Sequence, residues 1–184
     1  QAVALPLVQE FGYTREIEDR VMAPLPVWAV AVGKLVAGAG QGLIAAAIVF
    51  PLAHWIPITP VQLDIVWWRL LTILPLASVL GAALGLAIGT RADPRRVPLI
   101  FGVVVIPITF LGATYYPWAS LSSLPWLQTI VLLNPLVYMT EGMRVSLTPW
   151  VQHMSLWGIY GGLIVFTILL GAWGIQGFSK RVLS

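Results

Sequence analysis

Residues 65–88 read IVWWRLLTILPLASVLGAALGLAI, and this run decides the fold because it carries a single charge, Arg69. Roughly 20 consecutive, mostly apolar residues are needed for a helix to cross the hydrocarbon core of a bilayer. Uncharged surface of this length is favoured in lipid and aggregates in water. We therefore predict a membrane-spanning helix over about 65–88.

Three further apolar runs flank this one, over about 27–50, 97–115 and 155–178. Residues 117–150 are also apolar, but prolines at 117, 125, 135 and 149 divide them into pieces too short to cross. Such pieces are typical of a re-entrant hairpin or of helices lying at the interface. The pattern predicts an all-α, polytopic membrane helix bundle with residues 1–184 as a single domain.

The composition supports a lipid environment. Of the 184 residues 59% are hydrophobic and 9% are charged, whereas soluble domains carry about 25% charged residues. This excludes a disordered chain, a nucleic-acid-binding surface and most water-soluble enzymes. Cysteine is absent, which excludes disulfides, thiolate catalysis and cysteine-ligated metals within these residues. The stretch Gln1–Val8 resembles the last turns of an apolar helix, so we expect a chain that is incomplete at its N-terminus.

The few cations orient the bundle, because Lys and Arg accumulate in short cytoplasmic loops. With four crossings, one side receives Arg15, Arg20, Arg91, Arg95, Arg96, Lys180 and Arg181. The opposite side receives Arg144 and seven of the nine tryptophans, namely Trp55, Trp67, Trp68, Trp118, Trp126, Trp150 and Trp157. We interpret these rings as an aromatic belt at the outer interface; the alternative is that some of them line a substrate path.

Glycines recur at helical spacing in the first two spans. Gly38 and Gly42 are four residues apart, and so are Gly81, Gly85 and Gly89. Small residues on one face let helix backbones approach closely in lipid. We expect these faces to be helix contacts.

No motif for chemistry is present. The sequence lacks H-E-x-x-H, G-x-S-x-G and clustered acidic residues at metal-ligand spacing, and His54 and His153 fall in or beside the outer loops as solvated residues. It also lacks G-x-x-x-x-G-K-[ST], so any ATP must bind another chain. We expect no catalytic, cofactor-binding or metal-binding residues here.

A short amphipathic helix is predicted over about 14–23, before the first span. Thr14 can cap it, Pro24 must end it, and Tyr13, Ile17 and Val21 form an apolar stripe. Its oppositely charged i,i+4 pairs are Arg15 with Asp19 and Glu16 with Arg20. The helix either lies on the cytoplasmic membrane surface or docks on a soluble partner; charges of both signs fit a protein partner better than anionic lipid.

Glu141 and Arg144 form a second polar feature, near the outer side. At i,i+3 they can neutralise each other locally, or they can cap the top of a transport pathway. Two other charges, Lys34 and Arg69, fall inside predicted spans but close enough to an interface to snorkel. For Arg69, Asp64 is a plausible partner.

Two sequence segments resemble type-2 ATP-binding-cassette exporter permeases. The first is REIEDRVMAPLP over 15–26 followed by GKL over 33–35, which resembles the segment that joins the second and third spans of that family. The second runs from TFLGATYYP over 109–117 through Leu124-Pro125 and NPLVY over 134–138 to EGMR over 141–144, and resembles the family's late hairpin before the last span. The resemblance covers nearly the whole chain, but the first span and most of the second are missing.

The resemblance implies a permease of the bacterial cytoplasmic membrane that carries no cofactor itself. It implies two kinds of partner: two cytoplasmic ATPase subunits, which bind ATP and Mg, and a second permease copy, which is identical or closely paralogous. It implies that residues 14–22 form the coupling helix that docks on the ATPase. The corresponding residues are Thr14, Arg15, Glu16, Ile17, Glu18, Asp19, Arg20 and Val21. It also implies an extracellular re-entrant hairpin over 117–144.

The residues expected at the extracellular gate or pathway are Tyr115, Tyr116, Trp118, Asn134, Tyr138, Glu141 and Arg144. The implied activity is ATP-driven outward movement of a hydrophobic drug or lipid by alternating access. The alternatives are export of a lipid-linked polysaccharide or glycolipid, in which aromatic rings stack on sugars, and a membrane channel or scaffold that works without an ATPase.

Overall fold

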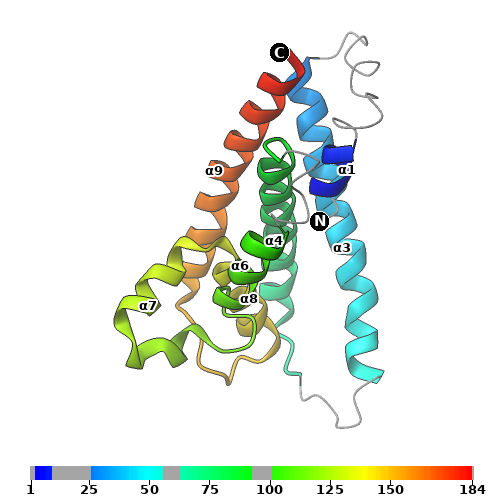
Figure 1. Ribbon diagram of the computed structural model, residues 1–184. Helices are drawn as coiled ribbons and strands as arrows, with labels where there is room; N and C mark the ends of the chain where they lie inside the picture. The colour runs from blue at the N-terminus through cyan, green and yellow to red at the C-terminus, as the bar shows by residue number, and fades with distance from the viewer. Residues whose placement is uncertain (1–2, 10–25, 56–62, 93–100, 184) are drawn as a thin grey trace.

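The computed structural model describes residues 3–9, 26–55, 63–92 and 101–183, and every regular element within these ranges is helical (Figure 1). The predicted helix over 14–23 and its eight candidate coupling residues lie outside the described residues. The elements are α1 (Ala4–Gln9), α3 (Val27–Trp55), α4 (Trp67–Gly89), the π-helix η3 (Phe101–Val105), α6 (Ile106–Leu111), the 3-10 helix η4 (Trp118–Ser123), α7 (Pro125–Ile130), the 3-10 helix η5 (Val131–Leu133), α8 (Pro135–Leu147) and α9 (Leu156–Leu183).

Three of these helices are long and apolar enough to cross a membrane: α3, α4 and α9. The shortest, α4, has 23 residues, which at a rise of 1.5 Å per residue span about 35 Å. They coincide with the first, second and fourth apolar runs, although α3 continues past Phe50 to Trp55 and α9 past Phe178 to Leu183. The all-α, polytopic membrane bundle predicted from the sequence is confirmed.

The third predicted span is irregular where the structure describes it. A π-helix over 101–105 leads into α6, which ends at Leu111, four residues before the predicted end. Gly112 and Ala113 then turn the chain, and Ala113 adopts the left-handed conformation with φ 54°. A single α-helix over 97–115 therefore does not describe this segment: from Phe101 to Tyr115 the backbone changes its hydrogen-bonding pattern twice.

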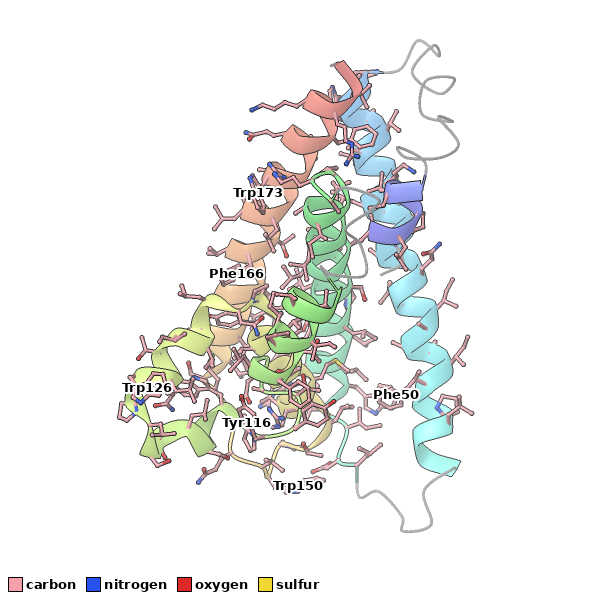
Figure 2. All side chains as sticks on the ribbon, viewed as in Figure 1. Phe50, Tyr116, Trp126, Trp150, Phe166 and Trp173 are labelled. Carbon is pink, nitrogen blue, oxygen red and sulfur yellow. The ribbon has the colours of Figure 1, made fainter. Side chains whose placement is uncertain are left out.

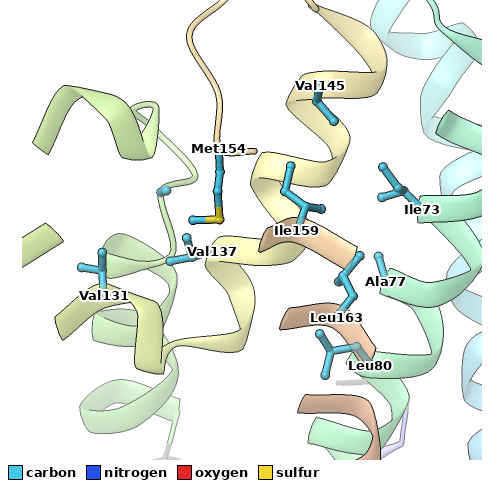
Figure 3. Packing of buried hydrophobic residues seen from close by; sticks show 10 residues of the cluster. Ile73, Ala77, Leu80, Val131, Val137, Val145, Met154, Ile159 and Leu163 are labelled. Atoms are coloured by element: carbon cyan, nitrogen blue, oxygen red, sulfur yellow. The ribbon is translucent and has the colours of Figure 1, made fainter. Parts of the chain in front are cut away.

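Helix α4 is the centre of the bundle, lying between α3 and α9 and contacting both, as well as α1 and α8 (Figure 1). In the most apolar stretch of each helix, 44% of the residues of α4 are buried, but only 6% of those of α3. The end at which α4 begins is the one that the cation pattern predicts to be outer, and it is called the outer end from here on. Near it, Ile73, Ala77 and Leu80 of α4 pack against Ile159 and Leu163 of α9 (Figure 3). The same cluster contains Val131, Val137, Val145, Met154 and Ala113.

Glycines bring the C-terminal ends of α4 and α9 together, at the end of the bundle that the cations predict to be cytoplasmic. A Cβ atom at Gly174 would lie 3.0 Å from the side chain of Leu86, and one at Gly177 would lie 2.6 Å from Thr90 Oγ1. This close approach lets Arg181 Nη1 donate to the carbonyl of Ala92 (3.0 Å) and to that of Thr90 (3.2 Å). These groups lie where α4 ends, so an α9 cation caps the negative end of the α4 dipole.

The glycine faces predicted to be helix contacts pack against two different elements, α1 and the facing long helix. Gly38, Gly85 and Gly89 receive α1: Cβ atoms at Gly85 and Gly89 would lie 3.1 and 3.0 Å from Val3 and Ala4, and one at Gly38 would overlap the Val3 side chain. Gly42 faces Ser78 of α4, where a Cβ would be 3.4 Å from Ser78 Oγ. Thus α1 fills the cytoplasmic half of a groove of small residues between α3 and α4.

Two adjacent glycines of α9 provide a matched test of this packing. A methyl group at Gly162 would overlap the ring of Tyr138, whereas one at Gly161 would meet nothing within 4 Å. We expect Gly162→Ala to destabilise the protein by about 1–3 kcal/mol through overpacking and Gly161→Ala to stay within about 0.5 kcal/mol of wild type. The measurement is the apparent Tm in detergent, with tryptophan fluorescence as the signal for unfolding. Equal Tm values for the two variants would contradict the packing of α8 on α9.

Candidate functional site

Exposed aromatic rings mark the outer end of the bundle. Trp67, Trp68, Trp126, Trp150 and Trp157 are each more than half exposed, and Trp157 reaches 90%. Trp126, Tyr116 and Trp150 lie toward the end at which α4 and α9 begin, whereas Trp173 lies toward the opposite end (Figure 2). Rings spread around one end of a membrane bundle are typical of an interfacial belt.

The end of α6 is held by side chains of α8. Helix α6 stops at Leu111, so carbonyls in and after its last turn lack helical partners. Asn134 Nδ2 donates to the carbonyl of Ile108 (2.6 Å), and Thr140 Oγ1 donates to that of Gly112 (2.6 Å). Unpaired carbonyls at membrane depth are costly, and α8 supplies the donors that make the break possible.

The same residues build α8. Asn134 is its N-cap and accepts from the backbone N–H of Leu136 (3.0 Å) through Oδ1, while Pro135 occupies the first helical position. This order is favourable, because Asn caps well and Pro at N1 sacrifices no hydrogen bond. One side chain therefore starts α8 with its oxygen and fixes the α6 end with its nitrogen.

Glu141 is completely buried, and its carboxylate accepts three hydrogen bonds. Oε1 accepts from the backbone N–H of Trp118 (2.9 Å) and from Nη1 of Arg144, while Oε2 accepts from the backbone N–H of Met154 (2.8 Å). A buried carboxylate is stable only when paired and hydrogen-bonded in this way. The carboxylate ties α8 to the start of η4 and to the segment before α9.

Arg144 extends this connection to the broken span. Its Nη1 forms the ion pair with Glu141, and its Nη2 donates to the carbonyls of Ala113 (2.9 Å) and Tyr116 (3.3 Å). The guanidinium can make the ion pair and these hydrogen bonds at once, because its N–H donors lie in one plane and point in different directions. The pairing expected at i,i+3 is present, and it also holds the turn that follows α6.

The C-terminal end of α8 is capped by the start of α4. Backbone N–H groups of Val66 and Asp64 donate to the carbonyls of Ser146 (2.9 Å) and Leu147 (3.0 Å), and Arg69 Nη1 donates to that of Val145 (3.2 Å). In the described part of the chain Arg69 thus contacts a carbonyl, and the ring of Trp68 at 5.2 Å, instead of the carboxylate of Asp64. Asp64, named from the sequence as a plausible partner of Arg69, is not its partner among the described residues, because the guanidinium donates to the end of α8 instead.

The remaining candidate residues lie around the polar centre that Glu141 and Arg144 form. Tyr138 packs against Phe166 with ring centroids 5.6 Å apart and donates its hydroxyl to the carbonyl of Leu132 (2.9 Å). Tyr115 is 70% exposed beside Phe110. The structure therefore brings Glu141 and Arg144 together with backbone groups of Trp118 and Tyr116. Asn134 lies against the last turn of α6, and Tyr115 and Tyr138 have other neighbours.

A cavity of about 830 Å³ adjoins the broken span. Its walls are α3, α4, α8 and the end of α6, and small residues such as Gly42, Ala45, Ala77 and Gly81 leave the space. Met139 and Met143 line it from α8, and Arg144 is the one candidate gate residue in its wall. The cavity occupies the outer half of the groove whose cytoplasmic half α1 fills.

Most polar groups of the cavity wall are already engaged. The hydroxyls of Thr109, Thr114, Thr140 and Thr148 all donate to backbone carbonyls. Among the described lining residues, Gln41 and Ser78 are the polar side chains without such a partner. No group of three His, Cys, Asp or Glu within the described ranges could hold a metal ion. The wall favours an apolar occupant.

These features define a multi-pass helical membrane protein in which the segment predicted as the third span is irregular from Phe101 to Tyr115. Residues 13–148 match the ABC-2 type transporter family, and the chain belongs to that family. The match includes the segment 14–21 and ends where α8 ends.

Curated relatives agree with the family match. The chain is 30% identical over 157 residues to the inner membrane transport permease YadH of Escherichia coli, an alignment that covers 85% of this chain and 59% of that protein. The YadH permease of Shigella flexneri matches with the same values. The chain spans about three fifths of the length of the curated relatives it matches. No solved structure matches the chain.

Removal of the buried carboxylate is the direct test of the polar centre. Glu141→Ala leaves the Arg144 guanidinium and two backbone N–H groups without their acceptor, so we expect a loss of about 3–5 kcal/mol. Asp64→Ala is the matched control at the same end, because its side chain is exposed and its backbone N–H is retained; we expect a change within about 0.5 kcal/mol. Thermal unfolding in detergent measures both. A Glu141→Ala protein as stable as the control would contradict the proposed centre.

The conformation of Ala113 gives a second prediction. A left-handed residue with a Cβ carries about 1–2 kcal/mol of strain, so Ala113→Gly removes strain but also a buried methyl group worth about 0.8 kcal/mol. We expect it to remain within about 1 kcal/mol of wild type. The β-branched Ala113→Val, which tolerates positive φ poorly, should be destabilised by at least about 2 kcal/mol. Tm values in the reverse order would contradict the turn.

Proposed function

We propose that this chain is the permease part of an ATP-driven exporter that moves hydrophobic or amphipathic molecules, drugs or lipids, outward across the bacterial inner membrane by alternating access. Its membership in the ABC-2 type transporter family and the inner membrane transport permeases among its relatives support this proposal. The chain acts as a non-catalytic subunit beside a second permease copy.

The observation that carries the proposal is the broken third span at the edge of a cavity. Irregular backbone at membrane depth is tolerated only where protein buries it or where it lines a cavity, and transporters use discontinuous helices at their binding sites. Here the break follows Leu111, and Thr109 and Thr114 on either side of it line the cavity. A passive scaffold has no need for such a break.

ATP hydrolysis belongs to a partner chain in this proposal. The sequence has no phosphate-binding loop motif, so ATP and Mg bind a cytoplasmic ATPase subunit. Residues 14–21, which carry charges of both signs, are the docking segment. A rigid helix at the cytoplasmic face can transmit a conformational change of the ATPase to the spans.

The cavity wall favours drug-like or lipid cargo over a glycan. No aromatic ring is among the described residues that line it, although stacking on sugars requires such rings. Met139 and Met143 present flexible, polarisable side chains that adapt to varied apolar shapes. Glycolipid export remains the second candidate, because exposed tryptophans surround the outer end.

The proposed coupling role predicts that changes in residues 14–21 reduce the stimulation of the ATPase without reducing the stability of the permease. With Glu16, Glu18 and Asp19 all replaced by Ala, we expect the reconstituted complex to lose at least about tenfold in cargo-stimulated ATPase rate, because several charged contacts with the partner disappear. Asp93→Ala, an acidic residue between the second and third spans, is the control. Tm and membrane insertion should be unchanged in both. Full stimulation of the triple variant by a panel of lipids and drugs would overturn the coupling assignment.

A further inference from the structure

We propose that Arg91 and Lys180 form a binding site for the headgroup of an anionic phospholipid, between the C-terminal ends of α4 and α9. The site lies beside Trp173, at the end of the bundle that the cations predict to be cytoplasmic (Figure 2). Neither cation lines the cavity, so the inference concerns the lipid around the protein and goes beyond the proposed transport function.

The guanidinium of Arg91 is held against α9. Its Nη1 donates to the carbonyl of Trp173 (3.1 Å), and its Cζ lies 3.8 Å from the centroid of the Trp173 ring. Gly177 makes this approach possible, because a Cβ atom there would lie 2.8 Å from Nη1 of Arg91. A hydrogen bond, a cation–π contact and the missing side chain of Gly177 thus fix the position of an exposed cation.

The same contacts direct the guanidinium back toward the bilayer. Thr90, the residue before Arg91, lies beside Gly177, where a Cβ atom would be 2.6 Å from Thr90 Oγ1. From this level Arg91 reaches to Trp173, which is four residues earlier in α9 and therefore about 6 Å deeper. Cations at a membrane interface normally extend toward water. The opposite orientation is favourable where an anion lies at the same depth.

Lipid phosphates lie at this depth. The 23 residues of α4 span about 35 Å, slightly more than the hydrocarbon core of about 30 Å, so Arg91 follows α4 at the level of the headgroups. Trp173 is 50% exposed, and Leu169, one turn before it, is 59% exposed. This face of α9 therefore meets lipid, and the guanidinium lies where headgroups and acyl chains join.

No carboxylate within the described ranges neutralises this end of the bundle. The acidic residues in those ranges are Asp64 and Glu141, which both lie at the outer end. In the sequence, residues 91–96 contain three arginines and one aspartate, and Lys180 and Arg181 add two further cations. Such an excess of positive charge at a membrane surface attracts anionic lipid.

Lys180 supplies the second cation of the site. It is exposed and follows Gly177 by three residues, so it lies on the same side of α9 as Arg91, one turn closer to the cytoplasm. Among the described residues Nε and Nη2 of Arg91 have no acceptor. The planar guanidinium can therefore donate to one phosphate while Lys180 contributes a point charge.

The surroundings favour a lipid over a soluble partner. A soluble protein docks beyond the ends of the helices, whereas the Arg91 guanidinium lies beside side chains exposed along the length of α9. A lipid with net negative charge is preferred to a zwitterionic one, because the ammonium group of a zwitterionic headgroup is repelled by the two cations. Phosphatidylglycerol has the required charge.

Native mass spectrometry of the full chain in detergent tests the site. Dioctanoylphosphatidylglycerol and dioctanoylphosphatidylcholine are added at equal concentrations, and the fraction of protein that retains each lipid is measured. We expect the unchanged protein to retain phosphatidylglycerol preferentially. Arg91→Gln and Lys180→Gln should each weaken the binding of phosphatidylglycerol by at least about fivefold, the effect of one cation at an anionic surface, and leave that of phosphatidylcholine unchanged.

Arg15→Gln is the matched control, because it removes one positive charge from the same predicted side of the membrane at a residue outside the site. It should bind phosphatidylglycerol like the unchanged protein. Arg91→Lys should give an intermediate affinity, since it keeps the charge but loses the planar donors and the stacking on Trp173.

Three results would overturn the proposal. The first is unchanged binding of phosphatidylglycerol to Arg91→Gln and Lys180→Gln proteins; a loss of ATPase stimulation in the same variants would then assign the two cations to the ATPase subunit. The second is an equal loss in Arg15→Gln, which would mean that total charge alone matters. The third is displacement of the lipid by excess inorganic phosphate, which would indicate a site for free anions.

If Arg91→Gln does not fold, Lys180→Gln decides alone, because Lys180 is exposed. Lipid retention requires neither ATPase nor cargo. It can therefore fail while the exporter proposal stands, and the ATPase experiment can fail while lipid is bound as expected.

Discussion

A carbonyl group at the end of a helix in a membrane needs a donor, and this requirement accounts for most of the polar contacts described above. Arg144 supplies it after α6, Arg69 supplies it at the end of α8, and Arg181 supplies it at the end of α4. In each case a cation lies at a helix C-terminus, where the helix dipole favours positive charge. Glu141 makes one of these caps possible by neutralising Arg144 away from water. Among the charged residues that the structure describes, Arg69, Arg144 and Arg181 with Glu141 are thus used at breaks and ends of helices.

This use of charge explains how a short, irregular segment fits between long apolar helices. A continuous third span would satisfy its own backbone and need no donors. A span that stops at Leu111 requires several, and α8 provides them from Asn134, Thr140 and Arg144 along one side of the helix. The break and α8 therefore depend on each other, since α8 in turn begins with the Asn134 cap.

The sequence predicts the long helices well, because the apolar length of α4 and α9 is a local property. It also predicts the ion pair of Glu141 with Arg144, since residues three apart on a helix are neighbours. It does not predict the acceptors on Ala113 and Tyr116 or the donors on Trp118 and Met154, which are 13 to 31 residues away in the chain. The turn itself gives no signal, because alanine is an unusual residue at positive φ. Arg69 illustrates the same limit: Asp64 is near in sequence, but the carbonyl that it binds is 76 residues away.

The packing around Gly142 shows that α8 is held more firmly in the bundle than α6. A Cβ at Gly142 would lie 2.7 Å from Ile73 of α4 and 3.3 Å from Ile159 of α9, so α8 is wedged between two long helices. Its C-terminal carbonyls are bonded to the start of α4 as well. Helix α6 has no buried residue, and outside its own span it packs chiefly on α8. Displacement of α8 would disrupt a packed core, which proteins resist, whereas displacement of α6 breaks a few side-chain hydrogen bonds. Helix α8 is therefore the more firmly held of the two helices, and α6 with the turn after it is attached mainly through hydrogen bonds to side chains of α8.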